Sequence, residues 1–117
     1  MGKIKIGGEM MSRVLVVDDD KGGAVLTKEY LELGGHTVVA ICLSEEDAIA
    51  RLEQLDFDVA VVDGLGGAGI FVARAVRATG RKVIGFSMDD VTFGDINVNR
   101  KEGRRLLVEK LGVLMED

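Results

Sequence analysis

Short apolar runs alternate along the chain with segments whose apolar residues recur at helical spacing. The runs are rich in valine and isoleucine, which favour strands, and two of them are apolar at every position, as in strands buried on both faces of a parallel sheet. The run nearest the carboxyl end is the weakest. We therefore predict strands at residues 14–17, 37–43, 59–62, 82–86 and 95–99.

The segments between these runs have the spacing and the end signals of helices. After the first strand, apolar residues repeat at helical spacing at Val25, Leu26, Tyr30, Leu31 and Leu33. Two glycines then provide a stop. Ser44, with Asp47 three residues later, is a capping pair for a second helix. Its predicted apolar face consists of Ala48, Ile49, Leu52 and Leu55. Two more helices are predicted at about residues 70–78 and 101–115.

Strands that alternate with helices five times predict an α/β fold with a parallel sheet and right-handed crossovers. The expected arrangement is a flavodoxin-like, doubly wound, five-stranded sheet of order 2-1-3-4-5 with helices on both faces. Residues 88–94 are few and polar, so the fourth helix is expected to be reduced or missing. We expect residues 1–10 to form an N-terminal extension, a flexible arm or short edge strand, and residues 11–117 to form one domain.

Acidic residues follow two strands of the predicted sheet. Asp18 and Asp19 follow the first strand, and Asp63 follows the third. In doubly wound sheets ligands bind beyond the carboxyl ends of the strands where the strand order reverses, which here is between these two strands. Clustered carboxylates repel each other unless a cation neutralises them, and Mg²⁺ is a natural partner for oxygen ligands. The alternative is that these aspartates only cap the following helices.

Composition restricts the function further. The chain has 117 residues and a net charge of −5, which argues against a direct nucleic-acid partner. The single cysteine, Cys42, cannot form an internal disulfide and suits a reducing compartment. No apolar run is long enough to span a membrane. We therefore expect a cytoplasmic protein without a membrane partner.

Three segments resemble the receiver domain of two-component response regulators. They are residues 14–20 (VLVVDDD), the helix end at residues 30–36 and residues 58–63 (DVAVVD). The resemblance implies that Asp63 attacks a phosphohistidine on a partner and becomes an aspartyl phosphate.

The same resemblance implies roles for other residues. Asp18, Asp19 and Asp63 would hold Mg²⁺, and the backbone carbonyl of Leu65 would complete the metal site. Ser87 occupies the position of the family's switch hydroxyl, which hydrogen-bonds the phosphoryl group.

The second half of the chain departs from the family. The loop after the phosphorylated residue, residues 64–69 (GLGGAG), is shorter and lacks the usual Met-Pro pair; the chain has 16 glycines and no proline. The usual Lys-Pro after the last strand is replaced by Asn99 and Arg100, which leaves Lys101 as a displaced substitute for the lysine. These changes predict an atypical receiver.

Our leading hypothesis is a stand-alone receiver, a phosphoacceptor rather than an enzyme, with at most self-catalysed phosphorylation and dephosphorylation. Its partners would be a sensor histidine kinase or phosphotransfer protein and a downstream protein target. One alternative is a pseudo-receiver that binds partners without phosphorylation. Another is a dinucleotide-binding module, because Gly64, Gly66 and Gly69 form a G-x-G-x-x-G motif between a strand and a helix.

The missing fourth helix also predicts association. Without it, part of one sheet face is expected to be uncovered, and apolar surface of that kind tends to be buried by association. We expect a homodimer that uses the strands at residues 82–86 and 95–99 and the last helix.

Overall fold

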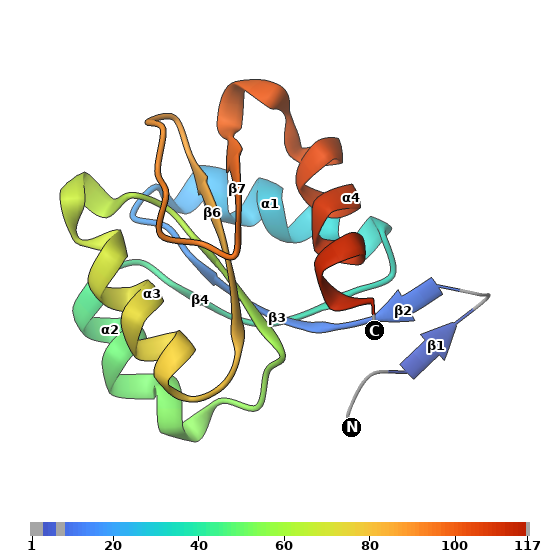
Figure 1. Cartoon of the computed structure of the whole chain (residues 1–117), viewed down its shortest axis with the longest axis horizontal. Coiled ribbons are helices and arrows are strands. Elements are labelled where there is room, and N and C mark those ends of the chain that lie inside the picture. Colours follow the sequence, from blue (N-terminus) through green and yellow to red (C-terminus); the bar gives the residue numbers. More distant parts are fainter. Residues whose placement is uncertain (1–3, 7–8, 117) are drawn as a thin grey trace.

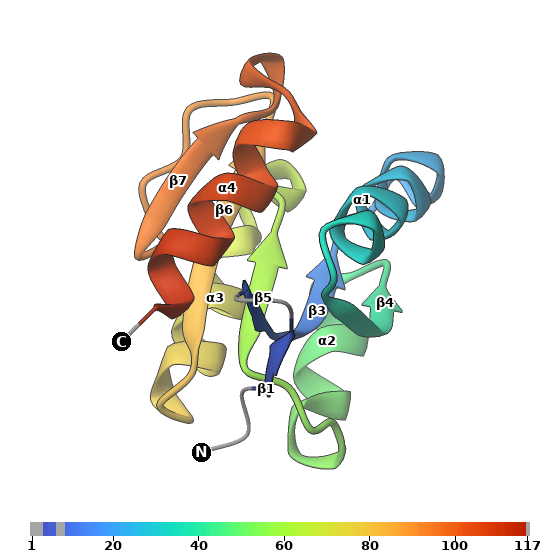
Figure 2. The same cartoon turned by 90° about the vertical axis from the view of Figure 1, so that its right-hand side faces the viewer.

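Five parallel strands form the central sheet of the protein. The computed structural model describes residues 4–6 and 9–116. The strands are β3 (Arg13–Val17), β4 (Thr37–Cys42), β5 (Val59–Val62), β6 (Lys82–Ser87) and β7 (Ile96–Asn99). Their order in the sheet is β4-β3-β5-β6-β7, and each neighbouring pair is parallel (Figure 2). The flavodoxin-like order predicted from the sequence is therefore confirmed.

Helices cover both faces of this sheet. They are α1 (Lys21–Leu33), α2 (Glu45–Arg51), α3 (Gly69–Ala78) and α4 (Arg104–Met115). Short 3₁₀ turns are η1 (Leu52–Gln54), η2 (Leu65–Gly67) and η3 (Arg100–Glu102). Helices α1 and α4 lie together on one face, and α2 and α3 lie together on the other (Figures 1 and 2).

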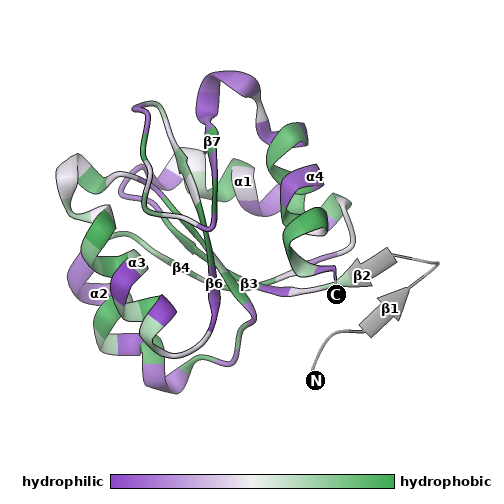
Figure 3. Ribbon diagram, in the orientation of Figure 1, coloured by the Kyte–Doolittle hydropathy of each residue, from purple (hydrophilic) through white to green (hydrophobic). Residues whose placement is uncertain are grey.

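The core is divided into two layers because side chains alternate across a strand. In β3, Val14 and Val16 pack in the cluster that includes residues of α1 and α4. Leu15 and Val17 pack in the cluster that includes residues of α2 and α3. Hydrophobic and hydrophilic residues alternate along α3 and α4 (Figure 3), as expected of helices that pack one face on a sheet. In the part of the chain that the structure describes, no helix is long and apolar enough to span a membrane.

No helix forms between β6 and β7 in the described residues 88–95, which confirms that the fourth helix of this fold is missing. The connecting loop folds back onto the sheet instead. A Cβ atom on Gly85 would lie 2.7 Å from Val91 and 3.3 Å from Phe93, so both side chains lie directly on β6. The sheet face that we expected to be uncovered is therefore partly covered by this loop (Figure 1).

The beginning of the chain forms a separate two-stranded sheet. Strand β1 (Ile4–Ile6) pairs antiparallel with β2 (Glu9–Met11). This hairpin lies beside the central sheet and is not one of its strands (Figure 1). Residues 4–6, within the extension expected at residues 1–10, therefore form a strand that pairs with the following segment and not with the edge of the central sheet.

Burial corrects the apolar faces suggested by the sequence. Helix α1 buries Ala24, Thr27 and Leu31 against the sheet, whereas Val25, Leu26 and Leu33 are exposed. In the predicted second helix, Ala48 of α2 and Leu52 of η1 are buried as expected, but Ile49 of α2 is exposed. The presence of both helices was predicted correctly. The predicted apolar faces were too wide, because they included apolar residues that flank the buried stripe.

Two leucines of α1 provide a matched test of this packing. Leu31 is fully buried and Leu33 is 87% exposed. Leu31→Ala should lower the free energy of unfolding by about 2–5 kcal/mol, because it removes buried methyl groups and leaves a cavity. Leu33→Ala should change it by less than about 0.5 kcal/mol. Urea unfolding followed by circular dichroism measures both, and equal losses would contradict the described register of α1.

Candidate acidic site

Three carboxylates meet at the carboxyl ends of two neighbouring strands. Asp18 and Asp19 directly follow β3, and Asp63 directly follows β5. One carboxylate oxygen of each residue lies within 4.8 Å of the others. The sequence predicted this convergence because the carboxyl ends of parallel strands lie at the same edge of a sheet.

Backbone N–H groups hold two of these carboxylates in place. The Asp20 N–H donates to Oδ1 of Asp18 at 2.9 Å, and the Leu65 N–H donates to Oδ2 of Asp63 at 2.9 Å. Asp18 is buried, whereas Asp19 is exposed. Each of these hydrogen bonds fixes one oxygen of the carboxylate and leaves its second oxygen free of the backbone.

The alternative that these aspartates cap helices finds no support. The residue at the N-cap of α1 is Asp20, and its side chain makes no capping hydrogen bond. Helix α3 has Ala68 at its N-cap. The carboxylates of Asp18 and Asp63 therefore lie at the edge of the sheet and do not cap α1 or α3.

An arginine from the opposite side of the site reaches both fixed carboxylates. Nη2 of Arg100 donates to Oδ2 of Asp18 at 2.7 Å and to Oδ1 of Asp63 at 3.3 Å. It also lies 3.4 Å from the carbonyl oxygen of Phe86, and the guanidinium carbon is 5.1 Å from the centre of the Phe86 ring. The Arg100 side chain is only 15% exposed. One guanidinium therefore pairs with two carboxylates at the edge of the sheet and offsets one of their two negative charges.

The turn η3 positions this arginine. Asn99 accepts a hydrogen bond from the Lys101 N–H, and the Glu102 carboxylate accepts one from the Asn99 N–H, which together form a capping box. Gly103 follows with a φ of 95°, a left-handed conformation that favours glycine, and it separates η3 from α4. The last helix therefore begins at Arg104, later than the predicted residue 101.

Burial dominates the ionisation of Asp18. The pKa of this carboxyl is raised above its usual value, first because of burial and also because of the nearby Asp63 charge. The Asp20 N–H and Arg100 lower the pKa but do not cancel these effects. The ionised pair of aspartates is thus costly without a cation.

Two residues expected to complete the site lie near it. Ser87 is the last residue of β6, is buried, and accepts a hydrogen bond from the Asp89 N–H at 3.3 Å. A Cβ on Gly64 would lie 3.1 Å from the Ser87 hydroxyl oxygen, so this glycine allows a close approach. Leu65 has a φ of 51°, an uncommon conformation for leucine, and its carbonyl oxygen accepts the Ala68 N–H at 3.1 Å.

Lys101, which we considered as the substitute lysine, is exposed, and its N–H donates to Asn99. The cation at the carboxylates comes instead from Arg100, which stands in the segment that replaces the usual Lys-Pro. A signal was available, because Arg100 directly follows the strand predicted at residues 95–99, whose carboxyl end lies at the same sheet edge. Residue type favoured the lysine, but the capping box determines which side chain turns inward.

The donor set of this site fits a hard divalent cation. Three carboxylates with oxygens within 4.8 Å of one another are ligands that Mg²⁺ accepts. The fit has one complication, since Arg100 already contacts an oxygen of Asp18 and an oxygen of Asp63.

Four N–H groups of the glycine-rich loop already donate hydrogen bonds within the protein. Those of Gly67 and Gly69 donate to the Gly64 carbonyl, that of Ala68 donates to the Leu65 carbonyl, and that of Leu65 donates to the Asp63 carboxylate. A phosphate-binding loop presents its N–H groups to the ligand. The arrangement therefore argues against the dinucleotide-binding alternative.

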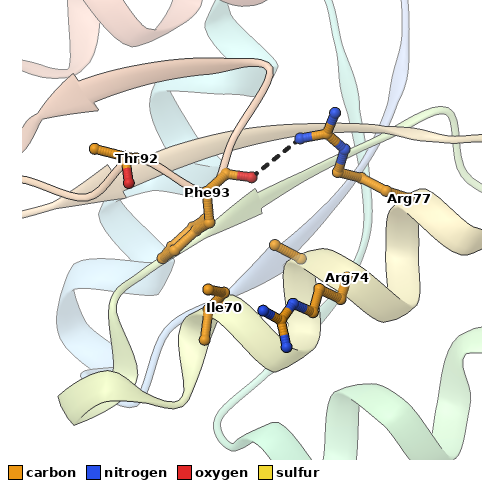
Figure 4. Close-up of a pocket in the computed structure, with 6 residues that line it drawn as sticks. Ile70, Arg74, Arg77, Thr92 and Phe93 are labelled. Atoms are coloured by element: carbon orange, nitrogen blue, oxygen red, sulfur yellow. Dashed lines mark hydrogen bonds between the residues drawn. The ribbon is translucent and has the colours of Figure 1, made fainter.

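A shallow depression of about 360 Å³ lies elsewhere, between α3 and the loop before β7 (Figure 4). Its lining residues are Ile70, Ala73, Arg74, Arg77, Thr92 and Phe93. Arg77 donates to the Phe93 carbonyl at 3.3 Å and pairs with Asp95 at 3.2 Å, so it fastens the loop to α3. The depression is separate from the acidic site.

Comparisons with known proteins identify the fold. No family model matches the chain, and no curated protein matches it. Among solved structures, the response regulator TrrA of Thermotoga maritima is 26% identical with a TM-score of 0.77, over 90% of this chain and 100% of that one. A CheY-like receiver from Methanospirillum hungatei is 24% identical with a TM-score of 0.74, over 86% and 90%. The chain therefore has the fold of the response regulator receiver domains, as the resemblance predicted.

Two glycines provide a matched test of the loop geometry. A Cβ on Gly69 would lie 2.2 Å from the backbone oxygen of Asp63, whereas a Cβ on Gly112 of α4 would meet nothing within 4 Å. Gly69→Ala should destabilise the protein by about 1–3 kcal/mol, because backbone must move. Gly112→Ala should stabilise it by about 0.5–1 kcal/mol, the helix preference of alanine. Thermal unfolding of both variants is the measurement, and a neutral Gly69→Ala would contradict the close packing at Asp63.

Proposed function

We propose that this chain is a receiver that accepts a phosphoryl group on Asp63 from a histidine kinase or phosphotransfer protein. The observation that carries the proposal is the position of Asp63, at the carboxyl end of β5 in a receiver fold, with two further carboxylates beside it. The Asp63 side chain is 15% exposed, so part of it is accessible to a donor.

Each residue of the site has a role in this proposal. A carboxylate oxygen of Asp63 attacks phosphorus, and the new O–P bond forms as the P–N bond to the donor imidazole breaks and that nitrogen is protonated. Asp18, Asp19, Asp63 and the Leu65 carbonyl would hold Mg²⁺, which neutralises charge on the phosphoryl oxygens. Ser87, at the end of the adjacent strand β6, would donate its hydroxyl to the phosphoryl group.

Two solved structures support the metal and phosphoryl parts of this proposal. TrrA was determined in complex with Mg(2+)-BeF, and the receiver domain of DrrB, which is 23% identical to this chain, was determined in a BeF3-activated state. The acidic cluster of this chain supplies the same kind of oxygen ligands to a divalent cation.

A phosphorylation-independent pseudo-receiver is the second candidate, and Arg100 favours it. A guanidinium that already pairs with Asp18 and Asp63 supplies a positive charge to the site without metal or phosphoryl group. In that case the protein would act through contacts with partners alone.

Phosphoryl uptake distinguishes these two candidates. Incubation with acetyl phosphate and Mg²⁺ should add the mass of one phosphoryl group to the intact protein, and Asp63→Ala should abolish the gain. Asp56→Ala is the matched control, because Asp56 is an exposed carboxylate near the opposite end of β5 and pairs with Arg13. Intact mass spectrometry is the measurement. No gain in the wild-type protein, or a gain that survives Asp63→Ala, would sink the phosphoacceptor proposal.

The proposal also includes a homodimer through β6, β7 and α4. Strand β7 is at one end of the sheet order, where its outer backbone edge is available for pairing. On α4, Val113 is 60% exposed although it is apolar. A second copy would cover both features.

Lysine substitutions on two helices test this dimer. Val113→Lys places a charge on α4 and should weaken self-association by about tenfold. Leu33→Lys is the control, because Leu33 is also exposed and apolar but lies on α1. Sedimentation equilibrium at high micromolar concentration is the measurement. A monomeric wild-type protein, or equal weakening by both substitutions, would contradict this interface.

A further inference from the structure

All four carboxylate oxygens of Asp18 and Asp63 already accept a hydrogen bond. One oxygen of each residue is tied to a backbone N–H, and the other faces Nη2 of Arg100. The two oxygens that face the arginine are the ones free of the backbone. A divalent cation that binds both residues would therefore approach the same two oxygens that the guanidinium holds.

Guanidinium and metal cannot share these oxygens without a cost. Mg²⁺ requires ligand oxygens at about 2.0–2.1 Å and an ordered shell around it. Like charges a few ångströms apart in a partly buried site repel strongly, because little water screens them. Each cation offsets negative charge on the carboxylates, whereas the two cations together repel each other.

The arginine is held in a way that allows it to leave. Its Nε is buried and has no hydrogen-bond partner among the described residues. Outward rotation would expose this N–H to water, which regains a hydrogen bond that the buried position lacks. Arg100 is also in a short 3₁₀ turn that begins directly after β7, and not inside a long helix.

We propose that Arg100 is a built-in counter-ion that competes with a divalent cation for Asp18 and Asp63, so that metal binding has to expel the guanidinium. The inference rests on the metal binding included in the proposed function, but it does not require phosphoryl transfer. Without metal, the arginine offsets part of the negative charge of these two carboxylates. Asp19, which is exposed and forms no ion pair with Arg100, is the ligand at which the incoming cation binds first.

Arg104 provides a matched control for the charge of Arg100. Its guanidinium also lies over Phe86, at 5.6 Å from the ring centre, so it is close to the site. Its hydrogen bonds go to the Thr27 hydroxyl and the Gly23 carbonyl, which are uncharged groups. Replacing either arginine by glutamine removes one positive charge, but only Arg100→Gln releases carboxylate oxygens.

Calorimetric titration of the intact chain with Mg²⁺ tests the proposal. Arg100→Gln should lower the dissociation constant for Mg²⁺ by at least about tenfold, a change of 1.4 kcal/mol. Arg104→Gln should lower it by less than about threefold, through the general field alone. Arg100→Lys, which keeps the charge without the planar fork, should give an intermediate value.

The competing outcomes are distinct. An Arg100→Gln affinity equal to or weaker than that of the wild type would overturn the proposal, as would equal gains in Arg100→Gln and Arg104→Gln. Absence of Mg²⁺ binding in every variant would overturn it as well. If Mg²⁺ binding improves in Arg100→Gln but no phosphoryl group is ever gained, the counter-ion role stands and the phosphoacceptor proposal fails.

A second measurement needs no substitution and applies even where a variant does not fold. In the wild-type chain, the Arg100 Nε–H signal in ¹⁵N NMR should shift and exchange faster with water as Mg²⁺ is added. It should follow the same saturation curve as the Asp63 amide. If the Asp63 amide signal saturates while the Arg100 Nε–H signal is unchanged, both cations occupy the site together. That result would contradict the proposal that Mg²⁺ expels the guanidinium.

Discussion

The arrangement of the acidic site depends on the repulsion between its clustered carboxylates. Parallel pairing of β3 with β5 brings Asp18 and Asp63 to one edge, and burial makes the Asp18 charge costly. Backbone N–H groups satisfy one oxygen of each carboxylate but bring no full positive charge. Only a cation completes the balance, and in this structure that cation is the guanidinium of Arg100.

The departures from the receiver pattern belong together physically. The missing helix between β6 and β7 leaves a loop that folds onto β6 through Val91 and Phe93. After β7, the capping box of Asn99 and Glu102 closes a short turn, and Gly103 sets the start of α4. These changes lie in the loop and the turn that follow β6 and β7, whereas the ends of β3 and β5 bring Asp18, Asp19 and Asp63 together as the strand order predicted.

The sequence predicted the elements and the carboxylate cluster because both follow from short-range rules. Buried parallel strands are apolar runs, and Asp18 and Asp63 follow such runs directly, so their meeting needed only the strand order. The inward turn of Arg100 could not be predicted in this way, since it depends on the backbone path of η3 and on the Phe86 ring beneath the guanidinium. The exposure of Leu33 was missed for a similar reason, because helical spacing alone does not say where the buried stripe of α1 ends.

In both the receiver and the pseudo-receiver hypotheses, Arg100 pairs with Asp18 and Asp63 in the absence of metal. The two hypotheses differ in how easily Arg100 leaves these carboxylates. A buried ion pair is a weak source of stability, because desolvation of the charges offsets most of their attraction. Arg100 also leaves its Nε buried without a partner among the described residues, a further cost of the closed position. The position of Arg100 is therefore held by the charges of Asp18 and Asp63 and by its contact with the Phe86 ring. It is not held by a fully satisfied hydrogen-bond network. An incoming cation of higher charge offsets those charges instead, and the geometry of the closed site is for this reason compatible with a phosphoacceptor.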